Sequence, residues 1–174
     1  MLRPFSFCSY HSAKFAIIRI MKYVSKSRQE TREIAQNFLN SIISHPGRAC
    51  VVALEGDLGS GKTAFTQAVG EILGVKENMH SPTFVIMKIY VLPDATPVNT
   101  PCLQGVRNLI HIDAYRLEKE SELLHLGWNE IIKEPENLVL IEWPENVPGI
   151  IPEDAKRIYF KFVDESTREI SYES

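Results

Sequence analysis

The chain has 174 residues and a mass of 19.8 kDa, which is enough for one domain with a substantial core and too little for two ordinary domains. Hydrophobic residues make up 44% of the chain and charged residues 24%, which excludes a disordered or fibrous protein. The longest apolar stretches are a few residues each, too short for a membrane-spanning helix of about 20 residues. The net charge of -3 argues against a nucleic-acid binder that relies on a generally basic surface, while it leaves room for a local basic patch.

Residues 1–20 differ in composition from the rest of the chain. No Asp or Glu occurs before Glu30, whereas Lys and Arg recur, and this is the composition of an organelle transit peptide. The alternative is an upstream start codon wrongly assigned, because Met21 begins a stretch with the character of a domain. We therefore expect a dispensable extension over residues 1–20, one domain over residues 21–174 and a cytoplasmic protein, with organellar targeting as the alternative.

The hydrophobic pattern predicts alternating helices and strands. Apolar residues at steps of three and four predict a helix over residues 28–44 and a second one that begins at Gly61 and ends at Gly74. A mixture of polar and apolar residues over 119–133 suits one or two short helices. Apolar runs predict strands over residues 49–54, 84–91, 108–113 and 138–142, and a closing hairpin over 155–164 and 167–171. Residues 92–107, with three prolines, are expected to form an exposed excursion between two strands.

The segment between the first of these strands and the second helix carries the most specific motif. Residues 56–63 read GDLGSGKT, the phosphate-loop pattern of a P-loop NTPase. Glycines let the backbone bring its N–H groups against phosphate oxygens, Lys62 adds a positive charge for the β- and γ-phosphates, and the Thr63 hydroxyl suits Mg²⁺. We therefore predict an α/β fold of the P-loop NTPase-like, three-layer sandwich type, with a mainly parallel central sheet and an antiparallel C-terminal hairpin. The predicted nucleotide-binding residues are Gly56, Asp57, Leu58, Gly59, Ser60, Gly61, Lys62 and Thr63.

Two acidic residues end neighbouring apolar runs. Asp113 ends LIHID and Glu142 ends LVLIE, so both are expected at the carboxyl edge of the sheet, where such folds bind ligands. A single acid there reads equally well as a helix cap or a solvated strand end. Two of them beside a phosphate loop favour one metal site and one catalytic position, and the local pattern leaves open which acid does what.

Three further positions have two interpretations each. Thr83, in the Ser-Pro-Thr turn of residues 81–83, either senses the γ-phosphate or belongs to an ordinary proline-fixed turn. Arg116 either supplies charge to the transferring phosphoryl group or forms a structural ion pair. Trp143 either stacks on a base or a partner, or fills the edge of the core.

Five motifs follow one another in the chain, at residues 56–63 (GDLGSGKT), 81–84 (SPTF), 111–117 (HIDAYRL), 122–132 (ELLHLGWNEII) and 141–147 (IEWPENV). In this order they resemble the TsaE family over about residues 21–170. TsaE proteins are the small ATPase component of the machinery that makes N6-threonylcarbamoyladenosine in tRNA. The resemblance implies Mg-ATP as the bound nucleotide and the homologous subunits TsaD and TsaB as partners, with tRNA reached only through them.

The resemblance also implies roles for single residues. Thr63 and Glu142 are similar in position to the Mg²⁺ ligands of the family, and Asp113 to an acid that ATP hydrolysis requires. Ser81 to Thr83 look like a switch beside the γ-phosphate. The resemblance further implies three nucleotide contacts, by Trp143, Thr31 and Arg168. The expected catalytic residues are thus Lys62, Thr83, Asp113 and Glu142.

Residues 1–20 and 92–107 depart from the family pattern, because the first precede the usual start and the second lengthen a connection. A small nucleotide, nucleoside or sugar kinase that uses the same phosphate loop remains the alternative function. A GTP-dependent switch is a third possibility, although the sequence has no NKxD guanine motif.

Overall fold

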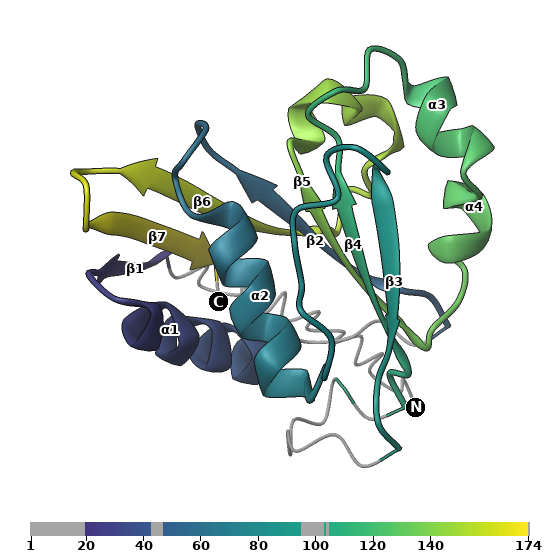
Figure 1. Ribbon diagram of the computed structural model, residues 1–174. Coiled ribbons are helices and arrows are strands. Elements are labelled where there is room, and N and C mark those ends of the chain that lie inside the picture. The colour runs from purple at the N-terminus through teal and green to yellow at the C-terminus, as the bar shows by residue number, and fades with distance from the viewer. Residues whose placement is uncertain (1–19, 43–46, 95–102, 104, 174) are drawn as a thin grey trace, which may run out of the picture.

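A computed structural model describes residues 20–42, 47–94, 103 and 105–173. Its strands form one sheet in the order β1-β7-β6-β2-β5-β4-β3 (Figure 1). The strands are β1 (Ile20–Ser25), β2 (Cys50–Glu55), β3 (Met87–Val91), β4 (Asn108–Asp113), β5 (Asn137–Glu142), β6 (Lys156–Phe162) and β7 (Arg168–Glu173). The helices are α1 (Arg28–Ser41), α2 (Lys62–Leu73), α3 (Glu120–His125) and α4 (Trp128–Ile131), with two short 3-10 helices, η2 (Pro144–Asn146) and η3 (Pro148–Ile150).

The sheet is parallel at its centre and antiparallel at both edges. β4, β5, β2 and β6 run in one direction, whereas β3 is antiparallel to β4, and β7 is antiparallel to both β6 and β1. The predicted α/β fold, with a parallel centre and an antiparallel C-terminal hairpin, is confirmed. Because β2 lies in the middle of the sheet, the loop that follows it opens at the centre of the carboxyl edge.

Hydrophobic cores cover both faces of the sheet and make three layers. α1 and α2 pack on one face, with Phe38 and Phe65 in the larger core. The short helices α3 and α4 cover the other face, where Leu123 and Trp128 are buried (Figure 1). Strands between two cores consist of continuous apolar runs, and all of β5 is buried. No helix in the described ranges is long and apolar enough to span a membrane.

β1 is a strand that the sequence pattern did not predict. Its residues alternate between exposed and half-buried until the buried Ser25, as expected for an edge strand. It pairs with β7 over its whole length, from Ile20 opposite Glu173 to Ser25 opposite Arg168. The predicted extension of residues 1–20 lies outside the described residues except for Ile20, with which β1 begins.

Two other predictions were wrong in part. The strand expected over residues 84–91 begins only at Met87, because the preceding residues form a turn in which Ile86 has a φ of 66°. In the excursion of residues 92–107, Pro93, Asp94, Gly105 and Arg107 are exposed as predicted, whereas three apolar side chains are buried. The exposed fractions of these three are 6% for Leu92, 2% for Leu103 and 8% for Val106. These side chains extend the larger core beyond the lower ends of β3 and β4. Residues 95–102 and 104 lie outside the described part of the chain.

Candidate active site at the carboxyl edge of the sheet

The loop between β2 and α2 has the backbone that a phosphate site requires. Gly56, Gly59 and Gly61 have φ angles of 145°, 75° and 106°, which side-chain-bearing residues rarely adopt. A Cβ atom on Gly56 would lie 2.3 Å from the Phe160 carbonyl oxygen, so only glycine fits there. Gly61 is also the N-cap of α2, so the positive end of this helix faces the loop. The Ser60 hydroxyl is buried beside them and has no hydrogen-bond partner among the described residues.

Lys62 folds back across this loop. Its Nζ donates hydrogen bonds to the carbonyl oxygens of Gly56, at 2.5 Å, and Asp57, at 3.1 Å. The same ammonium lies 3.8 Å from the ring centroid of Trp143, within cation–π range. Burial lowers the pKa of Lys62 below its usual value, and the negative charge of Glu142 offsets part of this shift. The Lys62 ammonium is therefore buried and held between the loop carbonyls and the Trp143 ring.

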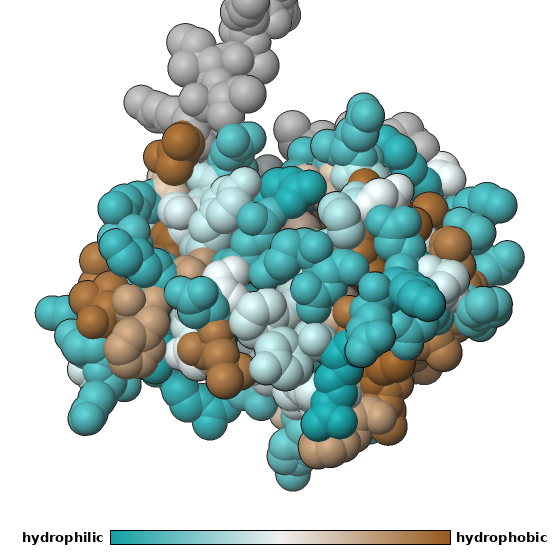
Figure 2. Space-filling view, turned by 90° about the horizontal axis from the view of Figure 1, so that it is seen from above, coloured by the Kyte–Doolittle hydropathy of each residue, from teal (hydrophilic) through white to brown (hydrophobic). Residues whose placement is uncertain are grey.

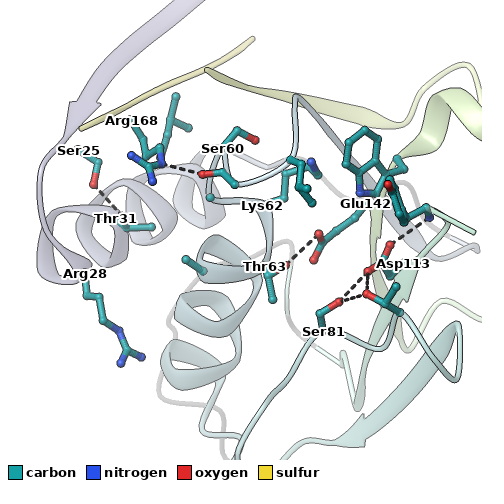
Figure 3. Close-up of a pocket in the computed structure, with 18 of the residues that line it drawn as sticks. Ser25, Arg28, Thr31, Ser60, Lys62, Thr63, Ser81, Asp113, Glu142 and Arg168 are labelled. Atoms are coloured by element: carbon teal, nitrogen blue, oxygen red, sulfur yellow. Dashed lines mark hydrogen bonds between the residues drawn. The ribbon is translucent and has the colours of Figure 1, made fainter. Parts of the chain in front are cut away.

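Glu142 links the helix that follows the loop to the neighbouring strands. Thr63 Oγ1 donates to Glu142 Oε2 at 3.0 Å, so a residue of α2 meets the end of β5 (Figure 3). The other carboxylate oxygen, Oε1, lies 2.8 Å from His111 Nε2 of β4. His111 and Glu142 are 0% and 3% exposed at their side chains. A hydroxyl and a carboxylate are hard oxygen ligands of the kind that Mg²⁺ prefers, so the donor set fits this ion.

Asp113 gathers the hydroxyl groups of the Ser-Pro-Thr turn. Its Oδ2 accepts hydrogen bonds from Ser81 Oγ, at 2.7 Å, and from Thr83 Oγ1 (Figure 3). Its Oδ1 accepts from the Tyr115 N–H at 3.1 Å. Asp113 is directly opposite Glu142 in the parallel pairing of β4 with β5, which places the two predicted acids side by side. The Ser-Pro-Thr turn is therefore hydrogen-bonded to the Asp113 carboxylate at the end of β4.

Trp143 has a strained backbone at the mouth of the site. Its φ of 59° is a left-handed conformation, which is unfavourable for a bulky residue. The indole packs against Tyr115, with ring centroids 5.0 Å apart, and against the Lys62 ammonium. Residues in such conformations occur preferentially where a ligand is bound. Trp143 also packs against the core under α3 and α4, so it lines the cavity and fills the edge of the core at once.

These side chains line one cavity of about 630 Å³. The far wall of the cavity is formed by β1, α1 and β7 (Figure 3). The hydroxyl of Thr31 in α1 is hydrogen-bonded to Ser25 Oγ in β1, at 2.7 Å. Arg168 Nε in β7 donates a hydrogen bond to the Gly59 carbonyl, at 3.0 Å. Of the predicted site residues, only Gly56 and Asp57 do not line it, and they act through their carbonyl groups on Lys62. The predicted residues that line the cavity are Thr31, Leu58, Gly59, Ser60, Gly61, Lys62, Thr63, Thr83, Asp113, Glu142, Trp143 and Arg168.

The structure adds residues that the sequence did not single out. His111 is one that the sequence analysis missed. Its position was a usable signal, because residues two apart in a strand lie on the same face, and His111 is a polar residue two positions before Asp113 in the apolar run NLIHID. Ser25, Ser27 and Arg28 line the cavity because β1 and the start of α1 reach it. Arg116, by contrast, does not line the cavity, and its guanidinium lies over an exposed ring.

Comparison with known proteins assigns the chain to a family. The family model described as threonylcarbamoyl adenosine biosynthesis protein TsaE matches residues 25–170, which is most of the chain. The chain belongs to the TsaE family. The matched span of this TsaE-family chain contains every residue that lines the cavity, from Ser25 to Ile170.

Relatives agree with this assignment. The tRNA threonylcarbamoyladenosine biosynthesis protein TsaE of Bacillus subtilis is 35% identical over 152 residues, which are 87% of this chain and 84% of the relative. The protein of the same name from Rickettsia typhi is 30% identical over 143 residues, 82% of this chain and 87% of the relative. The crystal structure of Bacillus subtilis YdiB matches with a TM-score of 0.65 at 26% identity, covering 91% of this TsaE-family chain and 88% of that chain.

Proposed function

We propose that the protein is a Mg-dependent ATPase of the machinery that makes N6-threonylcarbamoyladenosine in tRNA, working with TsaD and TsaB. The observation that carries the proposal is the shared cavity of the phosphate loop and two adjacent strand-end acids, Asp113 and Glu142. The pathway is supported by the names of the TsaE relatives. The chemistry is supported by the residue types at the site, as the following paragraphs argue.

ATP is the nucleotide that we propose for the cavity. The glycine loop, the N-terminus of α2 and Lys62 together supply the N–H donors and the positive charge that polyphosphate binding needs. A volume of about 630 Å³ is in the range of small-molecule sites and leaves room beyond the loop for a base and a ribose. Thr31 and Arg168 line the cavity from α1 and β7, so they are the proposed contacts to the nucleoside.

Mg²⁺ would be held by Thr63 and Glu142, whose oxygens lie together at the loop. When bound, this ion would neutralise charge that develops on the phosphate oxygens. The Thr63 hydroxyl donates a hydrogen bond to Glu142 Oε2. These two oxygens, Thr63 Oγ1 and Glu142 Oε2, are hard ligands that suit Mg²⁺. His111 would keep the carboxylate of Glu142 oriented, through the bond to Oε1.

Asp113 is the proposed residue for the attacking water. It accepts hydrogen bonds from the hydroxyls of Ser81 and Thr83, so it can exchange one of these for a water molecule and orient it. Orienting water and stabilising charge are the main tasks of a protein in phosphoryl transfer. Arg116, one candidate for supplying charge to a transferring phosphoryl group, does not line the cavity.

The experiment combines the protein with TsaD, TsaB, threonylcarbamoyl adenylate and tRNA, and measures modified tRNA over time. With ATP and Mg²⁺ we expect several rounds of modification per TsaD–TsaB complex. Asp113→Ala and Glu142→Ala variants should keep the fold, measured by circular dichroism, and stop after the first round. Unchanged ATP hydrolysis in both variants, or a phosphorylated small acceptor formed in equal amount with ADP, would contradict the proposal.

A further inference from the structure

The turn before β3 presents two adjacent apolar side chains to solvent. Phe84 is 84% exposed and Val85 is 65% exposed, whereas the Pro82 that precedes them is buried. Figure 2 shows the molecule from above the view of Figure 1, with hydrophobic side chains in several separate places on this face. Adjacent exposed apolar side chains beside a ligand cavity are typical of surfaces that another molecule covers.

This turn is fixed to Asp113 at both ends. At one end Ser81 and Thr83 bond to the Asp113 carboxylate, and at the other the Asp113 N–H donates to the Ile86 carbonyl at 2.9 Å. Inside the turn the Val85 and Ile86 N–H groups both donate to the Pro82 carbonyl, at 2.9 and 2.6 Å. The backbone that carries Phe84 and Val85 is therefore hydrogen-bonded to Asp113 on both sides.

A cation completes the exposed group. The Arg116 guanidinium lies 4.4 Å from the ring centroid of Phe84, and Arg116 is itself exposed. It forms no ion pair with a residue in the described ranges, unlike Lys88 nearby, which pairs with Glu77 at 3.0 Å. The charge of Arg116 is thus available for a carboxylate on another molecule.

We infer that Phe84, Val85 and Arg116 form a docking surface for a protein partner that offers an apolar pocket bordered by carboxylates. The inference rests on the proposed function, because it takes that partner to be the TsaD–TsaB pair. The surface shares Asp113 with the active site through the turn. Docking and the state of the nucleotide phosphates are therefore coupled at Asp113.

The composition of the surface favours a protein over nucleic acid. An aliphatic side chain beside an aromatic one suits an apolar pocket, and aromatic and Arg residues dominate the binding energy of protein interfaces. Nucleic-acid surfaces need several cations to neutralise phosphates, whereas this one has a single unpaired arginine on a chain with a net charge of -3. Direct binding of tRNA through this surface is therefore an outcome that would count against the inference.

The test measures the equilibrium affinity of the full chain for TsaD–TsaB from the same organism, with Mg²⁺ and a non-hydrolysable ATP analogue. We expect Phe84→Ala to weaken binding by about tenfold or more, as for an interface hot spot, and Val85→Ala to weaken it less. Arg116→Glu should weaken it as well, and the loss should shrink at high salt. The matched controls are Val91→Ala, 78% exposed at the far end of β3, and Arg32→Glu on α1, and both should bind as wild type does.

The affinity of each variant for the ATP analogue alone separates docking from nucleotide binding, and we expect changes of less than about twofold. If wild type binds TsaD–TsaB and Phe84→Ala binds equally well, the docking inference is wrong and the proposed function stands. If wild type does not bind TsaD–TsaB at all, the proposed function fails and the inference with it. Loss of tRNA binding or of self-association in Phe84→Ala, with TsaD–TsaB binding intact, would also overturn it.

Discussion

Glu142 has both carboxylate oxygens engaged inside the protein. Oε2 accepts from Thr63 and Oε1 contacts His111 Nε2. The buried Nδ1 of His111 has no hydrogen-bond partner in the described part of the chain. A proton on Nε2 suits this network, because Nε2 then donates to the Glu142 carboxylate. A buried nitrogen without a partner is unfavourable, so this arrangement of His111 costs stability.

Replacing His111 tests this orienting contact. His111→Leu should raise the Mg²⁺ concentration for half-maximal ATP hydrolysis by about 10- to 100-fold, the usual effect of losing a residue that supports a metal ligand. His111→Gln should retain most activity, because its amide N–H can reach the position of Nε2. Tyr90→Phe is the matched control, since it removes another buried polar atom without a partner. Equal Mg²⁺ dependence in the Leu and Gln variants would show that the bond to Glu142 is irrelevant.

Lys62 is the residue on which nucleotide binding should depend most. Lys62→Ala should weaken ATP binding by about 100-fold or more, because losing the partner of a buried charge costs about 3 kcal/mol. Isothermal titration with the ATP analogue measures this directly. Lys88→Ala removes an exposed lysine outside the cavity and should leave the affinity unchanged. Retained ATP binding in Lys62→Ala would refute the assignment of the loop.

At the scale of elements, the β6–β7 hairpin connects its own turn to the phosphate loop. Asp164 Oδ1 accepts from the N–H groups of Ser166, at 2.9 Å, and Thr167, at 2.8 Å. Arg168, the first residue of β7, donates to the Asp164 carbonyl at 2.6 Å and to the Gly59 carbonyl at 3.0 Å. The position of Arg168 in the cavity is therefore set by the turn as well as by the strand.

The turn also predicts a pH effect on stability. Hydrogen bonds from Ser166 and Thr167 lower the pKa of Asp164 below its usual 3.8. A lowered folded-state pKa means that the carboxylate stabilises the fold fully above pH 3.8 and that this contribution is lost as pH falls through the folded pKa. Asp164→Asn should therefore lower Tm at pH 7, and the difference from wild type should shrink as the pH falls below 3.8, measured by thermal unfolding. Glu165→Gln, in the same turn, should change Tm at neither pH.

At the scale of the whole molecule, β1 joins the N-terminal part of the domain to its C-terminal end. It pairs with β7 along all six residues and adds an ion pair of Lys22 with Glu169 at 2.9 Å. Tyr23 stacks on Tyr172, with ring centroids 5.6 Å apart. Its last residue, Ser25, lines the cavity and bonds to Thr31. β1 therefore closes both the sheet and the far wall of the site.

Two truncations separate the extension from this strand. Removing residues 1–19 should leave Tm within about 2 °C and ATP hydrolysis unchanged, since β1 begins at Ile20. Removing residues 1–25 should lower Tm by about 10 °C and weaken nucleotide binding, because the pairing with β7 and the contact with Thr31 are lost. Thermal unfolding and titration with the ATP analogue measure both. Equal behaviour of the two truncated proteins would contradict the role of β1.

The sequence by itself determined the central strands, the phosphate loop and the helix after it, because burial on both faces and glycine chemistry act over a few neighbouring residues. It also placed Asp113 and Glu142 at strand ends. Only the tertiary structure decided that these acids lie side by side, that His111 supports Glu142, and that β1 closes the site against β7. Those contacts depend on strand order and on pairing between distant segments, which no local pattern encodes.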